Sequence, residues 1–205
     1  MKHGEIDRGV FMKYIKLVDG LKSNASGFEY KIGEVNVADT WNPTTFDPAL
    51  MGGFNFSVEN KILRWVHRGD TVYDVEIPED AEVIDCPSPN CPHGVFRTNK
   101  INLSNPRKVT EDMVMEFYKK SELPQKTYYQ CIVVMLFKNY MNVAKQIIKD
   151  KVNKDNIEDC INEFERFITD KHDGLEHRFS YEDLWQEAKE IYDILLNIQR
   201  EKKQG

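Results

Sequence analysis

Two cysteines and a histidine lie close together in one short loop, and their side chains could bind a metal ion. Cys86 and Cys91 supply thiols and His93 supplies an imidazole, which are ligands that zinc prefers. A structural zinc site needs a fourth ligand, for which His67 or Asp85 is available. Three prolines stiffen the same loop, so a rigid loop that binds no metal is the alternative interpretation.

The same loop offers a nucleophile and a base. Residues two apart on an extended chain point to the same side, so the Cys91 thiol could meet the His93 imidazole, but no third group that would orient the base is evident. Asp74 and Glu76 share one face of a predicted strand, and we interpret them as a solvated charged face rather than a catalytic pair. Gly52-Gly53 lacks the companion residues of a phosphate-binding loop.

Aromatic side chains gather around the loop-rich middle of the first half of the chain. Such a group forms either part of a core or a groove for a ligand or a peptide. The candidate binding residues are Trp41, Phe46, Phe54, Asn55, Phe56 and Trp65.

The elements that position these groups change in character near residue 110. Before that point, glycine and proline separate short runs of alternating apolar residues, which are typical of a sheet. A short helix is expected from residue 57 to about residue 66, and Asn105-Pro106 is expected to end the sheet. The expected strands are residues 11–18, 28–33, 71–77, 81–84 and 96–103.

The second half is almost wholly amphipathic helix. Thr110 is the expected N-cap of its first helix, and Pro124 separates that helix from the next. The run from Cys131 to Phe137 is apolar on all sides, which predicts a central buried helix. The last helix has an apolar stripe that includes Trp185 and Tyr192, and this stripe either covers the central helix or forms a homodimer.

We therefore predict an α+β protein, with a small, mostly antiparallel β module at residues 1–109 and a module of four or five helices at residues 110–205. The formal net charge of -6 makes nucleic acid an unlikely partner. No apolar run approaches the roughly 20 residues that cross a bilayer, and the first residues lack an apolar signal core. We expect a cytoplasmic location, with reduced cysteines.

Three segments of the first half share a further pattern: FEYKIGE at residues 28–34, GFNFS at 53–57 and VYDVEI at 72–77, with a closing strand at 97–101. The pattern resembles a family of short uncharacterised domains found in phages and bacteria, over roughly residues 11–110. Asn55 stands where that family usually has histidine. The resemblance implies a protein encoded by a phage or a mobile element.

The same succession of strands places Lys16 early, Phe56 and Ser57 centrally and Glu76 later in the chain. This succession is similar to the split sheet of ADP-ribosyltransferases. The resemblance implies NAD as a cofactor, with Lys16, Ser57 and Glu76 in the roles of the basic, hydroxyl and acidic residues. Lys16 departs from the expected histidine or arginine, and Glu76 belongs to the strand after the short helix.

Because no nucleophile, base, complete metal set or phosphate loop converges in the sequence, binding is a better prediction than catalysis. We expect a cytoplasmic accessory or inhibitory protein, without a cofactor, that binds another protein through the loop-rich face. The alternative is an NAD-using enzyme similar to ADP-ribosyltransferases, or a degenerate NAD-binding fold.

Overall fold

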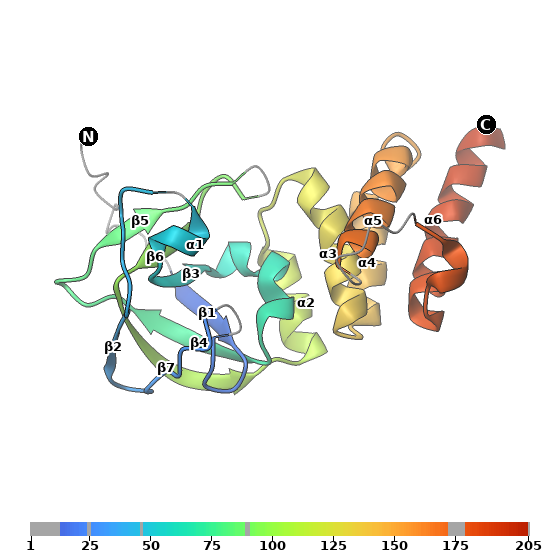
Figure 1. Cartoon of the computed structure of the whole chain (residues 1–205). Helices are drawn as coiled ribbons and strands as arrows, with labels where there is room; N and C mark the ends of the chain where they lie inside the picture. The colour runs from blue at the N-terminus through green and yellow to red at the C-terminus, as the bar shows by residue number, and fades with distance from the viewer. Residues whose placement is uncertain (1–12, 24–25, 46, 89–90, 172–178, 205) are drawn as a thin grey trace.

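The computed structural model describes residues 13–23, 26–45, 47–88, 91–171 and 179–204. Within these residues the chain forms a seven-stranded antiparallel sheet followed by helices, and the sheet and the helices lie side by side (Figure 1). The predicted α+β class is confirmed.

The sheet has its first strand at its centre. The strand order is β2-β7-β4-β1-β3-β6-β5, and every neighbouring pair is antiparallel. Two edges of the sheet are therefore formed by β2 and β5. The strands are β1 (Tyr14–Val18), β2 (Val35–Val37), β3 (Phe54–Val58), β4 (Thr71–Glu76), β5 (Val83–Asp85), β6 (Val95–Thr98) and β7 (Lys100–Lys108).

Several segments of the sheet differ from the sequence prediction. The strand expected at residues 96–103 is divided into β6 and β7, which are not neighbours in the sheet, and β2 and β3 form where no strand was expected. Residues 28–33 form isolated bridges and no strand, because the Asn36 side chain bonds both the N–H and the C=O of Lys31 and turns the chain there. β7 continues through Asn105-Pro106 instead of ending before it. The register between β4 and β7 shifts at this point, and a proline is tolerated at such a bulge.

Each face of the sheet belongs to a separate apolar cluster. Ile15, Leu17 and Val72 pack with the helices. The opposite face carries an aromatic-rich cluster that includes Tyr30 from the segment before β2. Its buried members are Val18, Tyr30, Phe54, Phe56, Tyr73, Ile101 and Leu103. Both faces of the central strands are therefore buried, so polar side chains on these strands need a partner.

The helices begin near the residues that the sequence indicated, with one exception. The side chain of Thr110 accepts a hydrogen bond from the backbone N–H of Met113, so the predicted N-cap is confirmed. The last helix begins at Gln186 and not after Ser180, because a short 3-10 turn intervenes. The helical elements are α1 (Pro48–Met51), the 3-10 helix η1 (Glu59–Arg68), α2 (Glu111–Lys120), α3 (Gln125–Phe137), α4 (Met141–Lys151), α5 (Ile157–Lys171), the 3-10 helix η2 (Tyr181–Asp183) and α6 (Gln186–Gln204).

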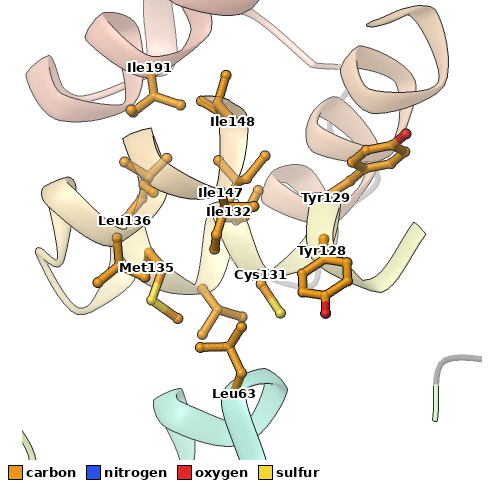
Figure 2. Close-up of a cluster of buried hydrophobic side chains, with 14 of the residues drawn as sticks. Leu63, Tyr128, Tyr129, Cys131, Ile132, Met135, Leu136, Ile147, Ile148 and Ile191 are labelled. Atoms are coloured by element: carbon orange, nitrogen blue, oxygen red, sulfur yellow. The ribbon is translucent and has the colours of Figure 1, made fainter. Parts of the chain in front are cut away.

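α3 is the central helix, as its apolar run predicts. Its residues from Thr127 to Leu136 are all buried, and the exposed positions are Gln125 and Lys126 at its start and Phe137 at its end. Figure 2 shows Leu63 of η1 pointing toward Cys131 and Met135 of α3. Because η1 also contacts β1 and β3, one continuous apolar core connects the helices to the sheet.

The apolar stripe of α6 is used within the chain. Ile191, Tyr192 and Leu195 are buried against the helical core, where α6 contacts α4 and α5. Trp185 is partly buried and stacks on Phe137, with 5.5 Å between the ring centroids. The homodimer that the stripe suggested stays a prediction.

Candidate functional site

The sheet opens between its two central strands. β1 pairs with β3 at Tyr14–Val58 and Ile15–Ser57, and the pairing ends there. Beyond that point β1 continues along β4, while β3 continues along β6. From Lys16 onward β1 therefore has no ladder hydrogen bonds to β3, and hydrogen bonds from side chains can take their place.

Lys16 occupies this opening and is only 4% exposed. Its Nζ atom donates to the backbone oxygen and to Oδ1 of Asn55, each at 2.6 Å. The same ammonium group lies over the Tyr30 ring, 5.5 Å from the centroid. Among the residues that the structure describes, no carboxylate lies within ion-pair distance of this amine.

The surroundings of Lys16 make it an unusual lysine. Burial, and then the positive charge of Arg97, lower the pKa of its amine from 10.5 to about 7. A buried amine with a strongly lowered pKa is a common feature of binding and catalytic sites. This lysine is therefore a functional candidate on geometric and electrostatic grounds.

A small pocket of about 30 Å³ lies beside this lysine, between β1, β3 and η1. Ser57 lines it, is 2% exposed, and has an Oγ atom without a hydrogen-bond partner among the described residues. Trp65 and Arg68 of η1 line the side away from the strands. The pocket thus joins a buried cation, an unpaired hydroxyl and an aromatic ring.

Two of the three residues implied by the resemblance to ADP-ribosyltransferases meet in this pocket. Lys16 and Ser57 both line it, but Glu76 does not. Glu76 is exposed at the end of β4, where it lies opposite Asn102 of β7. The strand order places β1 between β4 and β3, and the acid is consequently separated from the hydroxyl by one strand and by an offset along the sheet.

Three of the six predicted binding residues, Asn55, Phe56 and Trp65, line this pocket, whereas Trp41 and Phe54 do not. Phe54 and Phe56 are both buried in the cluster on the face opposite the helices. Trp41 packs against the backbone of Gly53, where an added Cβ would lie 2.6 Å from the indole, and its Nε1 donates to Glu82 at 2.8 Å. Asn55 is the partner of Lys16. Phe46 lies outside the described residues.

The loop between Cys86 and His93 does not gather its side chains in the described structure. The Cys91 thiol is buried and donates to the backbone oxygen of His93 at 3.4 Å, while the imidazole is turned outward, 4.0 Å from Asp85. The Cys86 thiol lies beside Met51. Burial raises the pKa of both thiols, which keeps them protonated at neutral pH. No group of three or more possible metal ligands occurs among the described residues.

Sequence reasoning missed several residues around the pocket. Arg68 lines the pocket and Arg97 lies near the Lys16 amine, and neither carries a local sequence motif. The signal that could have been used is Lys16 itself, a cation within the otherwise apolar run Tyr14–Val18. A charged residue on a strand buried on both faces needs an explanation.

The helices in the described part of the chain include none that is long and apolar enough to cross a membrane. The chain matches no family model, no curated protein and no solved structure. The resemblances to the phage and bacterial domains and to the ADP-ribosyltransferases therefore stay predictions from the sequence.

Proposed function

We propose that this protein is a non-enzymatic binding protein, which attaches an extended segment of another protein to the outer edge of β2. The observation that carries the proposal is the exposure of Val35 and Val37, which are 52% and 56% exposed on the edge strand. Exposed β-branched residues on an unpaired edge are the usual template for strand addition.

The backbone of β2 supports this geometry. Ala38 donates to Asn99 of the turn before β7, and Val37 lies opposite Lys100. Hydrogen-bonded residues alternate along an antiparallel strand, so the N–H and C=O groups of Val35 and Val37 point away from β7. No described strand pairs with that side of β2. A partner strand would satisfy these four groups and cover the two valines.

The charges beside the edge indicate the composition of the partner strand. Glu34 and Asp39 are both exposed and flank β2, and the whole chain has a formal net charge of -6. An apolar partner strand with basic residues near its ends would complement this surface.

The separation of Glu76 from Lys16 and Ser57 favours binding over catalysis, because the acidic role implied by the resemblance has no candidate in their pocket. The four cysteines are free thiols, which supports the proposed cytoplasmic location. The sequence resemblance alone suggests an accessory or inhibitory protein of a phage or a mobile element.

Affinity capture from a host lysate would supply a candidate partner, and the test is made on the purified pair. We expect slowed hydrogen exchange at the amides of Val35 and Val37 in the complex, because strand addition protects backbone groups. The double variant Val35→Lys/Val37→Lys should weaken binding at least about tenfold by blocking the edge. Leu50→Lys is the matched control, since Leu50 is 66% exposed but lies outside β2.

Binding that survives the double variant, or exchange protection that avoids β2, would overturn the proposal. Native mass spectrometry of the protein alone tests the alternative, in which a second copy of this chain pairs with the β2 edge. A dimer of this chain that dissociates in the double variant would show that a second copy, rather than a different protein, pairs with β2.

A further inference from the structure

We propose that the pocket between β1, β3 and η1 binds a small oxyanion head group, a phosphate monoester or a carboxylate, with Lys16 and Ser57 as its two donors. This site is separate from the β2 edge, and the inference does not depend on partner binding there.

The first argument is the incomplete pairing of Lys16. An ammonium group has three N–H donors, and the described structure supplies two acceptors, both on Asn55. Neither acceptor carries a negative charge. A buried cation without a counter-charge is unfavourable, and an anion in the pocket would supply both the charge and the third acceptor.

The second argument is independent of the lysine. Ser57 is 2% exposed and lines the same pocket, and its Oγ atom has no partner among the described residues. Buried polar groups in folded proteins are almost always hydrogen-bonded, so an unpaired hydroxyl beside a cavity is a suitable donor to a ligand oxygen there. A hydroxyl and an ammonium group that border one cavity are suitable donors for two oxygens of one head group.

The size and charge of the pocket define the ligand class. A volume of about 30 Å³ leaves room for roughly two water-sized groups, which suits the oxygens of a head group and not a complete nucleotide. Arg68 lines the pocket, and Arg97 is close enough to lower the pKa of Lys16. These guanidinium groups raise the local positive potential and favour an anion.

Binding of an anion should depend on pH through Lys16. The titratable and charged groups around it come from each neighbouring element: Tyr30, Tyr73 on β4, Arg97 on β6 and Arg68 on η1. The pKa of its amine is about 7, and a bound anion raises this pKa. Affinity should therefore be constant below that pH and fall above it, by up to about tenfold per pH unit.

The experiment is an amide NMR titration of the whole chain at about pH 6 and constant ionic strength, where Lys16 is charged. Sulfate, inorganic phosphate and acetate are the probes, with chloride as the reference. We expect saturable shifts at Lys16, Asn55 and Ser57 that reach half-saturation below about 10 mM for at least one oxyanion. A comparison of the affinities for phosphate and acetate distinguishes a phosphate head group from a carboxylate. The charge of sulfate is constant between about pH 6 and 9, so a change of sulfate affinity over this range reports the protonation of Lys16 and not of the ligand.

Lys16→Met should weaken the binding at least about tenfold, and Ser57→Ala should weaken it several-fold, since each removes one donor. Lys13→Met is the matched control, because Lys13 is an exposed lysine directly before the same strand and contacts Asp74 at 3.4 Å. Its shifts should saturate as in the unmodified protein. Ser57→Ala is a small change in volume and tests the site even if Lys16→Met alters the fold.

Three results would overturn the proposal. The first is that no oxyanion gives saturable shifts, and the second is that Lys16→Met binds as tightly as the unmodified protein. The third is that Lys13→Met loses as much affinity as Lys16→Met, which would mean that the effect is charge screening alone. NAD provides a fourth comparison. Saturation by NAD with none by the simple oxyanions would replace the head-group site with recognition of the larger molecule.

Discussion

Lys16 of β1 and Asn55 of β3 are joined by two hydrogen bonds from one Nζ atom, at the point where their strands stop pairing. This contact replaces part of the strand ladder and places a cation inside the sheet. It has consequences for stability as well as for ligand binding.

Lys16→Met should stabilise the protein at pH 6. The pKa of Lys16 is about 7 in the folded chain against 10.5 for the ordinary amine. Below pH 7 both states are protonated and the full cost of burying the charge opposes folding. As pH rises from about 7 toward 10.5 the folded state releases its proton first, so this cost declines and stability rises. The variant should be more stable by roughly 1–3 kcal/mol at pH 6, with a smaller difference at pH 9.

Urea unfolding of both proteins at the two pH values measures this difference. Other groups that titrate in the same way in both proteins contribute equally to the two stabilities, so their contribution cancels in the difference. A variant that is less stable than the unmodified protein at pH 6 would show that the Asn55 hydrogen bonds outweigh the burial of the charge.

Thr110→Ala should destabilise the chain by about 1 kcal/mol, because the Thr110 side chain caps α2 by accepting from Met113 N at 3.3 Å. Thr110→Ser retains the hydroxyl and should lose much less. Equilibrium urea unfolding measures both. Equal losses in the two variants would assign the effect to the methyl group instead of the cap.

Leu63→Ala should cost roughly 2–5 kcal/mol, because Leu63 is fully buried where η1 meets α3. Since one core connects the sheet and the helices, both halves should lose stability together. Fluorescence of single-tryptophan versions that retain Trp41 or Trp185 follows the sheet and the helices separately. Coincident transitions are expected, and two separated midpoints would contradict a shared core. Leu50→Ala, at an exposed position, is the control and should change stability little.

Glu163→Gln should destabilise the helical core at neutral pH by about 2 kcal/mol. Burial alone would raise the pKa of Glu163, but hydrogen bonds from Arg166, Gln130 and Lys126 hold it below the ordinary value. Stability from this carboxylate is therefore present at neutral pH and is lost as pH falls through the lowered pKa. The difference between the proteins should shrink below about pH 4 in thermal unfolding. A difference that is constant with pH would mean that packing, not charge, is responsible.

The helical half was largely predictable from the sequence. The N-cap at Thr110 and the break at Pro124 are local features of the chain, and the apolar run Cys131 to Phe137 requires a surrounded helix whatever its neighbours are. Only Phe137 differs, because it is the last residue of α3 and lies at the end of the core.

The loop of Cys86 and His93 shows the limit of local spacing. The bridge between Ser88 and Cys91 turns the chain so that one thiol enters the core. The outward turn of the neighbouring imidazole follows from this tertiary contact, and the distance in sequence does not reveal it.

The sequence by itself determined the class of fold, the change from sheet to helix near residue 110 and the presence of a lysine within an apolar strand. These properties follow from the period of apolar residues and from caps and breaks, which act over one or two turns of chain. Only the tertiary structure decided that Lys16 is buried and that it meets Asn55, 39 positions later. That meeting depends on strand order and on where β1 and β3 separate, and both result from packing between segments that are distant in the chain.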